Sequence, residues 1–243
     1  MRKLSLAFPF PLDQAEIFRR RTSILAMLLS EDEGFCSIPV KAINTLTLNQ
    51  MLRSYDELFF EGLLRRKLGR ITVTLSSRMT SAAGKFICTK GLFGKVVSAE
   101  IRMSSDFLIR LIDGPFLLNG LSVATPQEAF LIVFEHELCH AIETLLYGKT
   151  GHSQCFMALA NGLFGHTGTQ HSLPTRSQEA AQEGLKTGVR VRFSYQENML
   201  VGFVSYIGKA ATVMVPAADG KYRDRYGRRY AKYRVPLNRL EKM

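Results

Sequence analysis

The segment His136-Glu137-Leu138-Cys139-His140 has the H-E-x-x-H spacing, which on a helix can bind a metal ion and activate a water molecule. Two histidines four positions apart lie one above the other on a helix, with Cβ atoms about 5 to 6 Å apart, so both rings can reach one Zn²⁺ ion. Glu137 is turned by roughly 100° around the helix axis, which directs its carboxylate toward a bound water. The pattern predicts Zn²⁺ held by His136 and His140, with Glu137 as the general base of peptide hydrolysis.

A third metal ligand must come from outside the motif, because a catalytic zinc ion usually has three protein ligands and one open position. We expect His152, because Gly148 and Gly151 allow the chain to reverse after the helix and return a residue to the two histidines. Glu143 is the main alternative, since it lies three residues beyond His140 on the same helix, where a tripod geometry is harder to close. Two histidines in a polar, flexible-looking stretch are weaker candidates: His166 and His171.

The histidine pair also has a structural explanation, in which both rings are core side chains satisfied by hydrogen bonds. The chain contains only five histidines, so a chance match to the motif is uncommon, and a helical context favours the metal site. Tyr147 could stabilise an oxyanion, although a packing role is the more common one for such a residue.

Four cysteines are scattered along the chain without a C-x-x-C pair. This usage argues against a disulfide scaffold and against a cysteine-based zinc ribbon, and it favours a reducing, cytoplasmic location. We expect Cys139 to be packed as a small apolar side chain, and Cys88 and Cys155 to be buried as well. No uninterrupted apolar run approaches the roughly 20 residues that span a bilayer, so we expect no contact with a membrane.

The helix that must hold the motif has clear boundary signals. Thr125 is suited to the N-cap, Pro126 to the first helical position, and Glu128 completes a capping box three residues after the cap. The apolar pattern continues to Leu146, and Gly148 is placed as the C-terminal stop.

The remaining elements follow from apolar spacing. Intervals of three and four predict further helices at 13–30, 48–66 and 153–164. Short β-branched or alternating segments predict a small antiparallel sheet from residues 71–75, 85–89 and 96–103. After Gly188 the period becomes two, which predicts the strands of a small barrel at 189–195, 200–206, 211–215 and 230–235.

Charge is concentrated at the C-terminal end. The chain has a formal net charge of +11, and residues 184–243 contribute +9 of it, with 13 Lys/Arg against 4 Asp/Glu. Six of the eight tyrosines lie in the same segment. Cations can follow phosphates while aromatic rings stack on unpaired bases, so we expect this part to bind nucleic acid. The expected contacts are Arg223, Arg225, Tyr226, Arg228, Arg229, Tyr230 and Lys232. The alternative is a barrel with tyrosines in its core that binds a protein.

The chain is similar to the SprT-like (Spartan-like) metalloproteases over about residues 50–172. The landmarks that carry the likeness are Tyr55-Asp56-Glu57-Leu58-Phe59-Phe60 with Gly62-Leu63, Ile71 to Leu75 with Ser76 to Thr80, Ala83-Gly84, Ile101 to Ser104, the H-E-x-x-H helix, and Gly151-His152 followed by Phe156. The resemblance implies Zn²⁺ on His136, His140 and His152, Glu137 as catalytic base, and degradation of proteins trapped covalently on DNA. Many members carry a cysteine-ligated zinc ribbon after the protease, but no cysteine follows Cys155 here.

The expected fold class is α+β: a helical zincin-type protease domain with a small antiparallel sheet, followed by a small all-β SH3-like or KOW-like barrel. We divide the chain into an N-terminal helical extension (1–45), the SprT-like domain (46–172), a linker (173–187) and the basic barrel (188–243).

The expected function is zinc-dependent endopeptidase activity on DNA-bound or DNA-crosslinked proteins. The partners are then protein substrates and DNA, single-stranded or duplex, with a nucleoid association inside the cytoplasm. Two alternatives stay open: a nucleic-acid-binding adaptor with a structural zinc module, and a cytosolic metallopeptidase whose barrel binds a protein partner.

Overall fold

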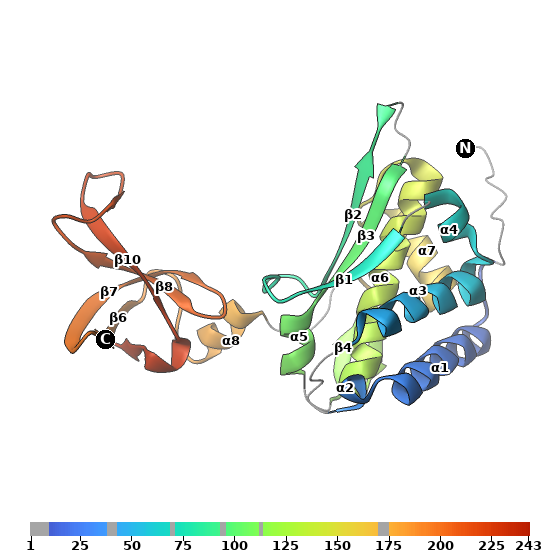
Figure 1. The fold of residues 1–243 in the computed structure, drawn as a ribbon, viewed down its shortest axis with the longest axis horizontal. Coiled ribbons are helices and arrows are strands. Elements are labelled where there is room, and N and C mark those ends of the chain that lie inside the picture. The colour runs from blue at the N-terminus through green and yellow to red at the C-terminus, as the bar shows by residue number, and fades with distance from the viewer. Residues whose placement is uncertain (1–9, 38–42, 69–70, 93–95, 112–113, 170–174) are drawn as a thin grey trace. The chain divides into compact units, whose positions relative to one another are not determined.

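The chain forms two compact units, residues 1–173 and 174–243, in a computed structural model that describes residues 10–37, 43–68, 71–92, 96–111, 114–169 and 175–243. Each unit has its own hydrophobic core. Figure 1 shows the first unit as helices beside a small sheet and the second as a strand-rich unit with one short helix.

The helices of the N-terminal unit are α1 (Gln14–Glu31), α2 (Glu33–Cys36), α3 (Thr45–Phe60), α4 (Leu63–Leu68), α5 (Ser105–Arg110), α6 (Pro126–Tyr147) and α7 (Gln154–Phe164). The single helix predicted over 48–66 is wrong, because the chain breaks between α3 and α4. Glu61 and Gly62 both have positive φ there. The carboxylate of Asp56 then accepts the backbone N–H groups of Leu64 and Arg65, which satisfies the start of α4.

The sheet of this unit contains β1 (Ile71–Ser76), β2 (Gly84–Lys90) and β3 (Val96–Ser104), in the order β1-β3-β2. The three predicted strands are present, but the sheet is mixed rather than antiparallel. β2 and β3 form an antiparallel pair, whereas β1 and β3 pair in parallel. This order leaves β2 at an edge. A separate hairpin is formed by β4 (Phe116–Leu118) and β5 (Leu121–Val123).

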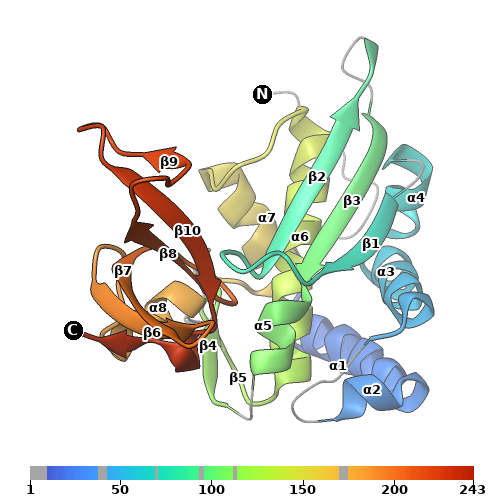
Figure 2. The same cartoon turned by 60° about the vertical axis from the view of Figure 1, so that its left-hand side comes forward.

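Helix α6 runs through the middle of the N-terminal unit, and β2 and β3 pack against it (Figure 2). Its start is the predicted capping box, in which the Thr125 side chain accepts the Glu128 N–H while the Glu128 carboxylate accepts the Thr125 N–H. It ends at Gly148, which has a φ of 70°. The helix is apolar on nearly all sides in its first half, because four consecutive residues that point in different directions are all buried: Leu131, Ile132, Val133 and Phe134. Among the described residues, no helix has the length and apolar character needed to cross a membrane.

The C-terminal unit contains α8 (Arg176–Gln182), β6 (Arg190–Tyr195), β7 (Asn198–Ile207), β8 (Ala211–Pro216), β9 (Tyr222–Arg223), β10 (Arg229–Val235), a short 3₁₀ turn (Leu237–Arg239) and β11 (Glu241–Lys242). The strands form one antiparallel sheet in the order β11-β6-β7-β8-β10-β9. Helix α8 lies within the segment predicted as a linker and contacts β7.

The prediction of a closed barrel is wrong, since β9 and β11 form the two edges and do not pair with each other in the described residues. Each of these edge strands is only two residues long, which gives little backbone for closure. The apolar face of the sheet is instead covered by Ala180 of α8 and Leu185, which join the core of Val191, Phe193 and Val213. Covering the face in this way buries it without closing the sheet.

Candidate metal centre

Three histidines converge beside the sheet. His136 and His140 lie one turn apart on α6, and His152 lies in the loop that leads into α7. One ring nitrogen from each lies within 4.8 Å of the others, and Nε2 of His136 is 3.0 Å from Nε2 of His152. Two nitrogens that bind one zinc ion at roughly 2.0 to 2.1 Å in tetrahedral geometry are about 3.3 Å apart. The three residues therefore fit a zinc ion with a fourth position left open.

The surroundings prepare the rings for metal binding. Phe156 packs against all three rings, with centroid separations of 4.5 to 5.1 Å. Nδ1 of His140 lies 2.6 Å from Oγ1 of Thr150. A ring that donates its Nδ1 proton to Thr150 keeps the Nε2 lone pair for a metal. Burial, helped by the neighbouring His152, lowers the pKa of His140 to about 4, so the ring is neutral at pH 7 and able to coordinate.

Glu143, the alternative third ligand, has another role. It is buried, and its Oε2 accepts the backbone N–H of Gly151 at 2.8 Å while its Oε1 accepts the hydroxyl of Ser153 at 2.9 Å. Both contacts flank His152 in the chain. The carboxylate thus holds the loop that presents His152 instead of joining the three rings.

The carboxylate of Glu137 lies beside the histidines, against strand β2. It is 5% exposed and accepts the backbone N–H of Phe86. Burial raises the pKa of Glu137 to about 7, and the Phe86 N–H opposes that shift in part. A carboxyl group with a raised pKa is a stronger base than an exposed one, which suits proton transfer near neutral pH.

Gly84 contributes to the site in a way that residue types did not indicate. A Cβ atom at this position would lie 2.7 Å from both Cγ and Oε1 of Glu137. The absence of a side chain at Gly84 therefore gives the Glu137 carboxylate its place against β2. In the sequence, Gly84 stands out only as one landmark of the family resemblance, and no local pattern shows that it meets Glu137.

A cavity of about 340 Å³ opens over this group and joins the histidines, Glu137 and residues 82–86. Thr150, Asn119 and Thr169 also line it. Tyr147 does not line it and is 46% exposed at the end of α6. The cavity is bordered by β2, the edge strand of the sheet.

Comparison with known families matches residues 48–177, more than half of the chain, to the SprT-like family. The chain belongs to the SprT-like family. Membership agrees with a metalloprotease site built on His136, His140 and His152. A search of curated proteins found none that matches this chain.

His166 of the SprT-like domain is not a ligand of the three-histidine centre. It is fully buried, and its Nε2 lies 3.0 Å from Oε2 of Glu135, the residue before the H-E-x-x-H motif. Asn119 Nδ2 lies 3.5 Å from the other ring nitrogen. The flexible placement expected for His166 is therefore wrong. His171 lies outside the described residues.

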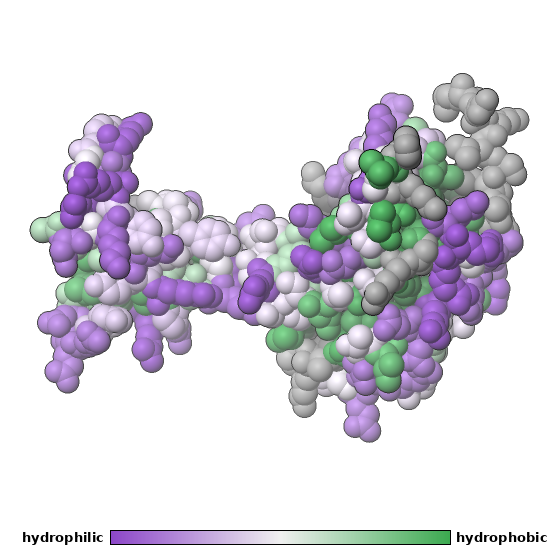
Figure 3. Space-filling model, turned by 45° about the horizontal axis from the view of Figure 1, so that its top comes forward, coloured by the Kyte–Doolittle hydropathy of each residue, from purple (hydrophilic) through white to green (hydrophobic). Residues whose placement is uncertain are grey.

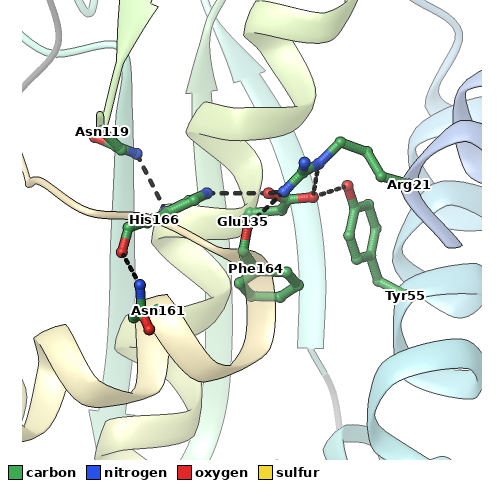
Figure 4. Close-up of polar contacts among 7 residues, drawn as sticks. All are labelled: Arg21, Tyr55, Asn119, Glu135, Asn161, Phe164 and His166. Carbon is green, nitrogen blue, oxygen red and sulfur yellow. Dashed lines mark hydrogen bonds and ion pairs between the residues drawn. The ribbon is translucent and has the colours of Figure 1, made fainter. Parts of the chain in front are cut away.

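Glu135 is shared by a wider buried network, which Figure 4 shows with His166 on one side of the carboxylate and Arg21 and Tyr55 on the other. Arg21 of α1 donates two hydrogen bonds of 2.7 Å to it, and the Tyr55 hydroxyl donates one of 2.9 Å. Burial would raise the pKa of Glu135, but Arg21 and His166 together hold it below its ordinary value. The network joins α1 and α3 to the helix that carries the motif.

The three cysteines that were expected to be buried differ in their exposure to solvent. Cys139 is buried in the SprT-like domain, as expected, because it packs inside α6. The expectation for the other two is wrong, since Cys155 is exposed and Cys88 is half-buried. Cys88 lies on β2 and Cys155 on α7, and the residues next to them in the sequence do not indicate which face of the strand or helix is buried.

The residues expected to contact nucleic acid occupy one hairpin of the C-terminal unit, outside the SprT-like match. Arg223 lies on β9, the turn holds Arg225, Tyr226 and Arg228, and β10 holds Arg229, Tyr230 and Lys232. Arg225 and Arg228 lie over the ring of Tyr226, which is 68% exposed. The face of this unit seen in Figure 3 is mostly hydrophilic.

Proposed function

We propose that the protein is a zinc-dependent endopeptidase that acts on proteins bound or crosslinked to DNA. The observation that carries the peptidase proposal is the buried carboxylate of Glu137 beside three converging histidines. A purely structural metal site has no need of such a base, which argues against the adaptor alternative. Zn²⁺ bound by the three rings would supply polarisation of the scissile carbonyl and acidification of a water molecule.

In this proposal one residue transfers the proton and others hold the reacting groups in position. Glu137 accepts the proton of the attacking water at a carboxylate oxygen and returns it to the leaving amine. Gly84 and the Phe86 N–H keep that carboxylate in place, and Glu143 holds the loop of His152.

The position of strand β2 favours a polypeptide as the substrate. It is an edge strand among the described residues, and its residues 84–86 line the cavity. The Phe86 N–H is taken by Glu137, so the other outward backbone groups of this edge are the ones left for a substrate. An extended peptide can pair with such an edge through main-chain hydrogen bonds, which are independent of side-chain identity. We therefore expect loose sequence preference and cleavage within extended, accessible segments.

The positive charge of the C-terminal residues favours the proposal that the substrates are linked to DNA. Residues 184–243 carry a net charge of +9, which favours association with a polyanion. Tethering to DNA raises the local concentration of proteins bound to the same strand, so an unselective active site can act on them.

The decisive experiment compares the full chain with Glu137→Gln. Each is incubated with zinc and a DNA-bound basic protein, with and without added DNA, and fragment formation is followed by gel electrophoresis. Cleavage by the unaltered chain alone, stimulated by DNA, supports the proposal. Cleavage that is indifferent to DNA supports a metallopeptidase whose C-terminal unit binds protein. No cleavage by either, with zinc present by elemental analysis, supports the adaptor.

A further inference from the structure

The sheet of the C-terminal unit buries one of its faces and leaves the other uncovered by the hydrophobic core of that unit. Alternate residues of the central strands, such as Val191, Val204 and Val213, are buried in that core. Because successive side chains of a strand point to opposite faces, the residues between them belong to the second face.

Strand register places these second-face residues in rows across the sheet. Arg190 of β6 lies opposite Phe203 of β7, Phe203 opposite Met214 of β8, and Met214 opposite Lys232 of β10. Two neighbouring rows are Pro216-Tyr230-Tyr222 and Tyr206-Thr212-Arg234. These rows contain aromatic and cationic side chains together with Met214, Thr212 and Pro216. Two carboxylates lie beside them: Asp224, which accepts the Tyr230 hydroxyl at 3.2 Å, and Glu241, which lies opposite Arg192.

The aromatic members of the rows are exposed: Phe203 is 41% accessible, Tyr206 56% and Tyr222 46%. This exposure argues against the alternative that the tyrosines of this unit serve mainly as core residues. Nζ of Lys232 lies 5.2 Å from the centre of the Tyr222 ring, so cation and ring lie on the same face. We call the set Arg190, Phe203, Tyr206, Tyr222, Lys232 and Arg234 the aromatic-basic face.

We propose that the aromatic-basic face binds single-stranded DNA, with bases stacked on Phe203, Tyr206 and Tyr222 and phosphates neutralised by the neighbouring cations. The proposal rests on the DNA-linked function above and deepens it by naming the surface and the strandedness. It assigns the contact mainly to the sheet and not to the turn at 224–228. The face lies beyond residue 177, outside the family match.

Strandedness follows from the chemistry of the face. Aromatic rings on a sheet can stack only on bases that are not already stacked and paired, so a duplex offers them its phosphates alone. Phe203 and Tyr230 also border a shallow hollow shared with Arg228 and Arg229. A base lodged there would have its phosphates beside the guanidinium group of Arg229, whereas that of Arg228 is paired with Asp224 at 2.7 Å. The net charge of +9 supplies the complementary field.

The test measures binding to the full-length Glu137→Gln chain, so that no proteolysis intervenes. The probes are a fluorescent oligothymidine, its duplex, and an abasic strand of the same length. We expect oligothymidine to bind more tightly than the duplex. Phe203→Ala should weaken its binding by about fivefold or more, because one stacked base is lost, and should leave abasic binding unchanged. Lys232→Ala should reduce the slope of log affinity against log salt by about 1.

Tyr195→Ala is the matched control, because Tyr195 is a 47% exposed aromatic residue of the same sheet that packs on Tyr233 at the other face. It should leave oligothymidine binding unchanged, and thermal melting checks that every variant is folded. Unchanged binding of Phe203→Ala, or equal affinity for single strand and duplex, overturns the assignment to this face while the DNA-linked function stands. Failure to bind any of the three probes overturns both.

Discussion

At the scale of single residues, the centre depends on groups that do not belong to its metal ligands. Gly84 leaves room for the Glu137 carboxylate, and Glu143 ties down both sides of His152. Thr150 orients the ring of His140. Such partners matter because a catalytic group displaced by a fraction of an ångström loses much of its effect.

Gly84→Ala should lower the rate of peptide cleavage by about 10- to 100-fold, because the new methyl group would lie 2.7 Å from Glu137 and push the carboxylate away. Zinc content should stay the same, since the three histidines are untouched. Gly151→Ala is the matched control, because no atom lies within 4 Å of its added Cβ, its φ is not positive, and alanine keeps the backbone N–H that Glu143 accepts. Steady-state kinetics and metal analysis of both variants check this, and equal rates for the two would contradict it.

At the scale of elements, the buried carboxylate of Glu135 connects α6 to α1, α3 and the segment after α7. Its partners Arg21, Tyr55 and His166 come from three different parts of the chain. Because Glu135 is fully buried, its charge must be compensated for these elements to stay together. The helix that carries the motif is thereby held from both sides.

Arg21→Met should destabilise the N-terminal unit by about 3 kcal/mol, because it leaves the buried Glu135 without its main counter-charge. Urea unfolding measures the change. Arg19→Met is the control on the same helix: Arg19 pairs with Glu16 while 68% of its side chain is exposed, so its loss should have a much smaller effect. Similar shifts for the two variants would show that the network does not hold α1 in place.

At the scale of the whole molecule, the two units have separate cores and only the first carries the three histidines. A ligand stabilises the part of a protein whose folded state binds it. Metal binding should therefore stabilise one unit selectively.

Zinc at about 100 times its dissociation constant should add roughly 2.7 kcal/mol to the N-terminal unit and leave the C-terminal unit unchanged. Helix circular dichroism follows the first unit. Tyrosine fluorescence follows the second, since six of the eight tyrosines lie in residues 184–243 and the chain has no tryptophan. A chelator should reverse the shift, and His136→Ala should abolish it. Parallel shifts of both signals would contradict the separation.

Local patterns were sufficient to predict α6, its caps and its histidine pair, because capping and helical spacing depend on residues a few positions apart. The role of Glu137 as general base stays a prediction. Local patterns also favoured His152 over Glu143, since two glycines allow a short reversal. The alternating strands after residue 188 were predicted for the same reason. The excess of positive charge in this segment follows directly from its composition.

Contacts between distant segments were beyond such patterns. The approach of Gly84 to Glu137, the burial of His166 against Glu135, the parallel pairing of β1 with β3 and the open edges of the C-terminal sheet all join residues far apart in the chain. Their energies arise from packing and from compensation of buried charge, which depend on what the fold brings together. Neighbouring residues could thus specify the reactive groups, whereas the packing of distant elements set their burial, their partners and the room around them.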